Sequence, residues 1–227
     1  ERLNERFDPR LHGGDSLPET GALLVGNHSL LGVDTMGLLP LLYRETGRVP
    51  RALAFKALFD VPGAGKLLRE IGMVPGERGA AVEMLQNDQL VVVYPGGVKD
   101  SMKGRTDRYG LFWEGRKGFA AVAIESQRPI IPVAAIGPDE VFPTFSKSGV
   151  FPLKMLGKTR IPLAIPFARR VYFDYFLGEP IHPPTREDGA TREGLNAFAR
   201  EVQEALESLI TEGLERGRVK GGRTRSF

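Results

Sequence analysis

The sequence of 227 residues contains no cysteine, one tryptophan and three histidines. The absence of cysteine excludes disulfide bonds, thiolate nucleophiles and cysteine-bound metals. The widely spaced His12, His28 and His182 form no recognisable metal-binding pattern. We therefore expect no metal and no cofactor, and any chemistry must come from His, Asp, Arg, Lys or the backbone.

Long hydrophobic runs and dense charge are also missing. No apolar run approaches the roughly 20 residues that span a bilayer, and no signal peptide is visible at Glu1. The net charge is only +3, although the isoelectric point is about 9.2. The basic residues are scattered or confined to the C-terminus, which argues against a nucleic-acid partner but favours anionic ligands.

Apolar segments alternate with segments of helical spacing along the chain. The segments 23–26, 51–55, 90–94, 129–136 and 170–176 predict strands, and 90–94 is the clearest of them because it is apolar on both faces. Strands that alternate with helices form βαβ units. The sequence therefore predicts a single α/β domain with a mostly parallel central sheet flanked by helices.

The stretch around His28 is the first candidate site. A predicted strand ends in Asn27 and His28, and Asp34 follows six positions after the histidine. His28 would then lie at a strand-to-helix turn, where open α/β folds place their chemistry. We expect Asp34 to cap the next helix and to orient the imidazole, whose other nitrogen becomes a general base. An ordinary turn with a helix-capping aspartate is the alternative from these residues alone.

A second candidate site follows the strand predicted over residues 90–94. Gly96 and Gly97 allow a ligand to approach the backbone closely, and Lys99 is placed to meet an anion. Arg78 stands in a turn before a predicted helix over residues 79–87. A loop that binds nothing is the alternative, because two adjacent glycines are a weak signal.

Together these residues resemble the glycerolipid and lysophospholipid acyltransferase family, the PlsC-like domain, over most of residues 22–184. His28 and Asp34 resemble its first block, His-x4-Asp, and Arg78 stands where the second block has arginine. Tyr94-Pro-Gly-Gly-Val-Lys99 resembles the third block, usually Phe-Pro-Glu-Gly-Thr-Arg. Lys117-Gly118 and Pro129-Ile-Ile-Pro-Val133 resemble the fourth.

Two positions depart from the family pattern. Five residues separate His28 from Asp34 where the family usually has four, and Gly96 stands where the third block has glutamate. Pro-Gly-Gly followed by a basic and then an acidic residue is similar to the branch of diacylglycerol acyltransferases and plant phytyl ester synthases. Their acceptor is a neutral lipid alcohol, but Arg78 and Lys99 leave a phosphorylated acceptor open.

The resemblance implies an irregular lead-in over residues 1–20, an acyltransferase domain over 21–215 and a basic tail over 216–227, which we expect to be a disordered arm. The Pro-rich apolar segment 141–167 would line a tunnel for the acyl chain or rest on a membrane. Basic side chains would then lie near lipid headgroups, namely Lys154, Lys158, Arg160, Arg169 and Arg170. The expected location is peripheral, on the cytoplasmic face of a membrane.

The activity implied by the resemblance is transfer of an acyl group from acyl-CoA or acyl carrier protein to a hydroxyl of a lipid acceptor. His28 would be the general base and Asp34 its partner. Substrate-binding positions would be Arg78, Pro95, Gly96, Gly97 and Lys99, with the N–H groups around Gly96 and Gly97 as oxyanion donors. Two alternatives stay open: a hydrolase that uses the same pair on water, and a non-catalytic lipid-binding module.

Overall fold

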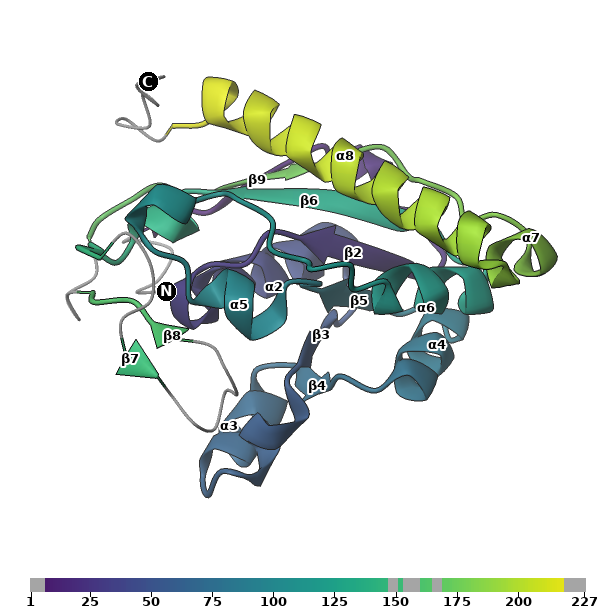
Figure 1. The fold of residues 1–227 in the computed structure, drawn as a ribbon, viewed down its shortest axis with the longest axis horizontal. Helices are drawn as coiled ribbons and strands as arrows, with labels where there is room; N and C mark the ends of the chain where they lie inside the picture. The colour runs from purple at the N-terminus through teal and green to yellow at the C-terminus, as the bar shows by residue number, and fades with distance from the viewer. Residues whose placement is uncertain (1–6, 147–150, 153–159, 165–168, 219–227) are drawn as a thin grey trace.

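The computed structural model describes residues 7–146, 151–152, 160–164 and 169–218. In this part of the chain, seven strands form one sheet in the order β1-β9-β6-β2-β5-β3-β4 (Figure 1). The strands are β1 (Arg10–His12), β2 (Ala22–Gly26), β3 (Arg51–Ala54), β4 (Met73–Pro75), β5 (Leu90–Val93), β6 (Ile130–Ile136) and β9 (Asp174–Leu177). A separate antiparallel pair consists of β7 (Phe151–Pro152) and β8 (Arg160–Ile161).

Five neighbouring strands of the sheet, β6, β2, β5, β3 and β4, run parallel, whereas β9 is antiparallel to β6 and β1 is parallel to β9. The central strand β2 is buried along its whole length, with Leu24 opposite Val92 of β5 and Ile131 of β6. Strands covered on both faces have no polar side to show, which explains their unbroken apolar sequences. The expected mostly parallel α/β sheet is confirmed.

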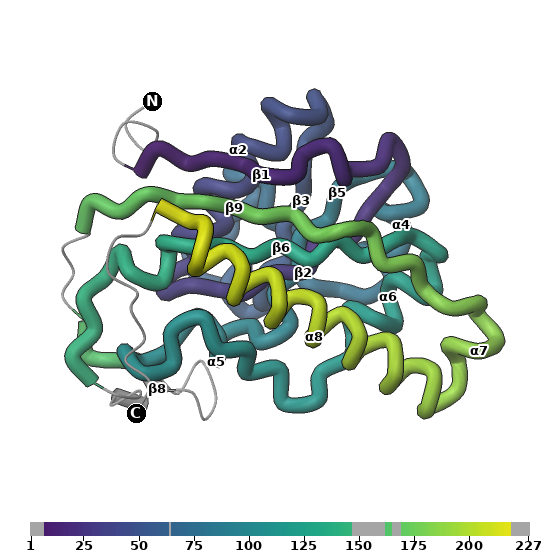
Figure 2. The backbone as a smooth tube through the Cα atoms, turned by 90° about the horizontal axis from the view of Figure 1, so that it is seen from above, coloured from purple at the N-terminus to yellow at the C-terminus, as the bar shows by residue number. Residues whose placement is uncertain are grey.

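Helices cover both faces of the sheet. They are α2 (Val33–Thr46), α3 (Ala64–Glu70), α4 (Arg78–Gln86), α5 (Gly97–Ser101), α6 (Gly118–Ser126), α7 (Arg186–Ala190) and α8 (Arg192–Arg216). Figure 2 shows α8 crossing one face, and its apolar residues share a core with α4 and α6. Helix α2 packs on the opposite face, where it shares a second core with β1 and β9.

Short 3-10 helices complete the described elements: η1 (Gly14–Ser16), η2 (Leu30–Gly32), η3 (Lys56–Asp60), η4 (Arg105–Asp107) and η5 (Pro138–Glu140). The long helix α8 begins as its sequence predicts. The side chain of Thr191 accepts a hydrogen bond from the N–H of Gly194 and so caps the helix. Phe198, Val202 and Leu206, four residues apart, form the buried face.

The expected lead-in and the first residues of the expected tail make contacts that the sequence did not indicate. Within the lead-in expected to be irregular, Arg10–His12 forms the edge strand β1 beside β9. Arg218, in the tail expected to be disordered, donates from its backbone N–H to Asp174 of β9 at 2.8 Å. Both contacts join residues far apart in sequence, which no local pattern indicates. Residues 219–227 lie outside the described part of the chain.

Much of the segment expected to line a tunnel, 141–167, lies outside the described residues, and Lys154 and Lys158 lie there too. One cavity of the described part is built from other elements, at the carboxyl ends of the parallel strands. In the described regions we find no helix whose length and hydropathy would let it cross a bilayer.

Candidate active site

The turn after β2 is anchored to the neighbouring strand by Asn27. Its side-chain amide donates to the carbonyl of Ala135 at 3.0 Å, and its side-chain oxygen accepts from the N–H of Ala135 at 2.8 Å. Asn27 is buried, so both bonds are shielded from water. This two-way bond between β2 and β6 fixes the point at which His28 leaves the sheet.

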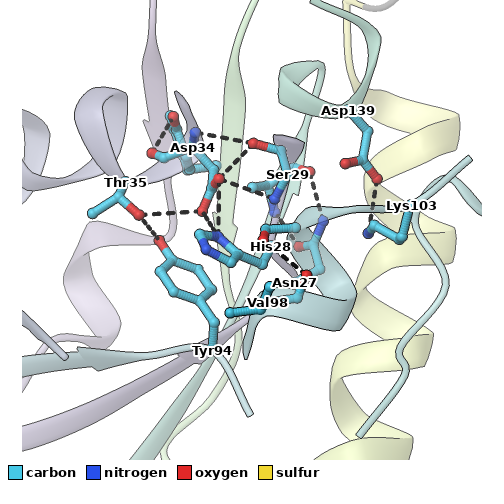
Figure 3. Close-up of polar contacts among 12 residues, drawn as sticks. Asn27, His28, Ser29, Asp34, Thr35, Tyr94, Val98, Lys103 and Asp139 are labelled. Atoms are coloured by element: carbon cyan, nitrogen blue, oxygen red, sulfur yellow. Dashed lines mark hydrogen bonds and ion pairs between the residues drawn. The ribbon is translucent and has the colours of Figure 1, made fainter. Parts of the chain in front are cut away.

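His28 and Asp34 are in contact (Figure 3). The Nδ1 atom of His28 lies 3.0 Å from Oδ2 and 3.2 Å from Oδ1 of Asp34, as the spacing in the sequence suggested. A carboxylate accepts, so Nδ1 carries the proton and the lone pair of the neutral ring lies on Nε2. This is the tautomer that a general base requires, although the catalytic role itself stays a prediction.

Asp34 is completely buried and well supplied with donors. Its Oδ1 accepts from the backbone N–H of Ser29 at 3.0 Å and from the Ser29 hydroxyl at 2.5 Å. Burial raises the pKa of Asp34, but the electrostatic influence of His28 and the hydrogen bonds from His28 and Ser29 outweigh burial, so the net pKa is below its usual value. Asp34 is therefore a stable carboxylate partner for the imidazole.

The extra residue between His28 and Asp34 is accommodated by two left-handed residues. Leu31 has φ 61° and Gly32 has φ 67°, and Gly32 occupies the N-cap position of α2. The expectation that Asp34 caps this helix is therefore wrong: it is the second residue of α2, and its carboxylate turns back to Ser29 and His28. The wider turn preserves the contact between acid and base.

Three residues that we did not predict as site residues hold this turn in place. The ring of Tyr94 stacks on His28, and its hydroxyl lies 3.1 Å from that of Thr35. From β9, Tyr175 donates its hydroxyl proton to the backbone carbonyl of Asp34 at 2.8 Å. A Cβ at Gly37 would lie 2.3 Å from the Tyr175 oxygen, so only glycine allows this approach. Tyr94 belongs to the third block, but Tyr175 has no signal in the sequence.

A cavity of about 770 Å³ opens at the carboxyl ends of β3, β4 and β5, and its lining does not include His28 or Asp34. Its lining includes every residue predicted to bind substrate, namely Arg78, Pro95, Gly96, Gly97 and Lys99. Tyr94 also lines it and connects it to His28 through the stacked rings. The predicted substrate-binding residues therefore share this cavity, whereas His28 is linked to it through the ring of Tyr94.

Cationic side chains of the cavity lining form ion pairs with exposed glutamates. Arg78 donates to Glu125 at 2.8 Å, Lys56 donates to Glu77 at 2.7 Å, and Lys99 pairs with Glu114. Ion pairs this exposed to water contribute little to stability. An anionic ligand can therefore replace these carboxylates at small energetic cost.

The backbone around the two glycines is less available than expected. The N–H of Gly97 donates to the carbonyl of Tyr94 at 2.9 Å, which removes it as an oxyanion donor in this conformation. The carbonyl of Gly96 accepts from Arg116 at 2.8 Å. Across the described ranges, no group of three or more His, Asp or Glu side chains is arranged to hold a metal ion.

A partly exposed histidine paired with a buried aspartate at the carboxyl edge of a parallel sheet agrees with the sequence blocks, and comparison with known proteins establishes the class. The sequence model of the Acyltransferase family matches residues 8–136, and the chain belongs to this family. The resemblance drawn from the blocks is thereby confirmed.

The chain is also similar to individual named proteins. The chain is 31% identical over 202 residues to a Gallus gallus protein named "DGAT1/2-independent enzyme synthesizing storage lipids", covering 88% of this chain and 58% of that protein. For the Bos taurus protein of the same name the identity is 31% over 221 residues, covering 92% and 64%. The chain thus spans less than two thirds of the length of these relatives.

Among solved structures, the fold is similar to that of the 1-acyl-sn-glycerophosphate (LPA) acyltransferase PlsC from Thermotoga maritima. The TM-score is 0.51 at 18% identity, covering 94% of this chain and 74% of the other. At this identity the likeness concerns the fold alone, and it agrees with the sheet and helix layers described above.

Proposed function

We propose that this domain transfers a fatty acyl group from an acyl thioester to a hydroxyl of a glycerolipid or lipid alcohol, with His28 as the general base. The observation that carries the proposal is the His28–Asp34 contact, which the ring of Tyr94 links to a cavity with a cationic lining. The family to which the chain belongs supports the same reaction class.

The proposed reaction needs no covalent acyl-enzyme. The hydroxyl oxygen of the acceptor attacks the thioester carbonyl carbon while its proton passes to Nε2 of His28. Asp34 stabilises the imidazolium that forms. The tetrahedral intermediate then collapses, the carbon–sulfur bond breaks, and the departing thiolate takes the proton from His28. One ester is formed, one thioester is consumed, and His28 returns to its starting state.

The donor is proposed to be acyl-CoA or acyl carrier protein, because in both the thioester is carried on an arm whose other end bears phosphate. Cations that line the cavity supply partners for such phosphates, among them Lys56, Arg78 and Lys99. The acids that now pair with them are exposed and easily replaced.

The acceptor is proposed to be a neutral lipid alcohol, with a lysophospholipid as the second candidate. The name of the avian and bovine relatives refers to storage lipids. Position 96 is glycine, where the third block usually has glutamate. Such acceptors reside in membranes, so we propose peripheral attachment at the cytoplasmic face. The exposed side chains of Leu31, in the His–Asp turn, and Phe55, at the cavity, support an apolar contact there.

An acyltransferase assay tests the proposal. Labelled long-chain acyl-CoA, or acyl carrier protein, is offered with monoacylglycerol, diacylglycerol, long-chain alcohol or lysophosphatidate to the wild type, to His28→Ala and to His182→Ala. His182 is exposed and outside the cavity lining, so its variant is the matched control. We expect one acceptor to be acylated, and we expect His28→Ala alone to lose at least about 100-fold in rate.

Two results would overturn the proposal. Release of free fatty acid without acylated product would establish the hydrolase. Inactivity of the wild type with every donor and acceptor would favour the lipid-binding module, as would equal rates for wild type and His28→Ala.

A further inference from the structure

The backbone of Gly96 lies directly against the side chain of Asp100. A Cβ atom built at position 96 would lie 1.9 Å from Cγ of Asp100, and 2.1 and 2.2 Å from its two carboxyl oxygens. These separations are far below contact distance. The Asp100 carboxyl therefore occupies the space in which a side chain at position 96 would begin, and position 96 is where the third block usually has glutamate.

The Asp100 side chain is buried and only partly satisfied. Its Oδ1 accepts from the backbone N–H of Phe112 at 2.7 Å. Its Oδ2 has no hydrogen-bond partner among the described residues, although Asp100 is 0% exposed. A buried carboxyl oxygen without a donor costs free energy, and proteins keep such groups mainly where function requires them.

Asp100 belongs to the part of the fold that carries the catalytic turn. Its helix, α5, packs against η2, which lies between His28 and Asp34. Burial is the largest influence on the pKa of Asp100 and raises it above its usual value, although Lys103 and the N–H of Phe112 act in the opposite direction. Lys103 itself is buried and paired with Asp139 at 3.0 Å (Figure 3).

We propose that Asp100 is a positioning residue of the acyl-transfer site. Its carboxyl, carried on α5, takes the place of the glutamate carboxyl that the third block usually has at position 96. The Asp100 carboxyl packs against Gly96 of the cavity wall and accepts from the N–H of Phe112. When it is ionised, Asp100 also favours the imidazolium that forms on His28 during transfer, because α5 packs against η2 in the turn between His28 and Asp34. The inference rests on the proposed acyl transfer, since its kinetic consequences are read in that reaction.

A double-mutant cycle tests the contact between positions 96 and 100. Gly96→Ala pushes the carboxyl away from the Phe112 N–H, and Asp100→Ala removes it. We expect each single variant to lose about 10- to 100-fold in kcat/KM, because small displacements of catalytic elements are costly. The double variant should lose no more than the worse single variant, since both act through one carboxyl. Losses that multiply would overturn the proposal.

Asp100→Asn removes the charge of the side chain at position 100 but nearly keeps its shape. Asparagine keeps the size of the side chain and an oxygen for the Phe112 N–H, so we expect a Tm close to that of the wild type together with a fall in kcat of at least about tenfold. Asp15→Asn, at an exposed aspartate outside the cavity lining, is the control and should change neither. Wild-type kcat in Asp100→Asn would show that the charge plays no part.

The failure of this inference is distinguishable from that of the proposed function. If the wild type transfers no acyl group, acyl transfer itself is wrong, and the cycle can still be read from the Tm of the four proteins. If the wild type is active and the cycle shows no coupling, only the role of Asp100 is wrong.

Discussion

The phenol ring of Tyr94 lies almost flat on the imidazole of His28, with 4.2 Å between the ring centroids and 12° between the planes. Burial and the nearby Asp34 carboxylate raise the pKa of Tyr94 well above its usual value, so the phenol stays neutral. The stacked ring therefore restricts the tilt of the imidazole without competing for its proton.

This stacking predicts different effects for two substitutions at position 94. Tyr94→Phe keeps the ring and loses only the contact with Thr35, so kcat should stay within about threefold of the wild type. Tyr94→Leu removes the flat surface and should lower kcat by at least about tenfold, because the base is less well oriented. Steady-state kinetics of acyl transfer check both variants. Equal losses in the two would show that the hydroxyl, not the ring, matters.

Asp34→Asn tests the partner of the base. Asparagine favours the wrong histidine tautomer, and we expect kcat to fall by roughly 10³- to 10⁴-fold. Unfolding in urea at pH 6 should show a loss of about 1–3 kcal/mol, because the buried donors of Ser29 lose a carboxylate acceptor. Asp15→Asn, an exposed change, is the control for both measurements.

The lowered pKa of Asp34 also predicts how this stability difference depends on pH. The carboxyl binds its proton less readily in the folded state than in the unfolded state, so its contribution is complete above the unfolded pKa of about 3.9. It is lost as the pH falls through the folded pKa. The wild type should exceed Asp34→Asn by a constant amount from pH 6 to 5 and by less below about pH 4. A difference that grows on acidification would contradict this sign.

Leu31→Asn is expected to stabilise the protein. Leu31 is 67% exposed and has φ 61°, a left-handed conformation that costs a branched side chain about 1–2 kcal/mol and that asparagine adopts more easily. We expect the free energy of unfolding to rise by about 1 kcal/mol in chemical denaturation. Met36→Asn, at an exposed apolar residue in regular helical backbone, should give no gain. A gain at Met36 but not at Leu31 would show that the turn is unstrained.

Lys99→Ala tests the anion-binding role of the cavity. We expect KM for acyl-CoA to rise about three- to tenfold at low salt with kcat little changed, and the difference to shrink at high salt because exposed charges are screened. Lys66→Ala is the matched control, since the Lys66 side chain is 85% exposed on α3 and outside the cavity lining. Equal effects of the two substitutions would remove Lys99 from the donor site.

Local patterns predicted the parts of the fold that local interactions determine. The strands β2 and β5 are continuous apolar runs because both of their faces are covered, and the buried face of α8 repeats every four residues. The contact between His28 and Asp34 was also predictable, because six residues of one turn suffice to bring them together.

Other features depend on partners distant in sequence or on backbone detail. The three-residue strand β1 is too short to show a period, and it exists because β9 lies beside it. Asp34 does not cap α2 because the left-handed Gly32 takes that position. Asp100 lies close to Gly96 because of the turn into α5. The sequence pattern does not indicate that the Asp100 carboxyl fills the space of a side chain at position 96.

The hydroxyl of Tyr175 bonded to the backbone of Asp34 bears on the order in which a ribosome delivers this chain. The turn that carries His28 emerges early, whereas the strand β9 that holds it ends at residue 177 and leaves the exit tunnel much later. The edge strand β1 is synthesised earlier still, and it can pair only after β9 has been synthesised. A nascent chain that ends at residue 136, where the family match stops, already carries His28, Asp34 and the cavity lining but not the hydroxyl that fixes the turn. Maturation of the site is therefore a late event in synthesis.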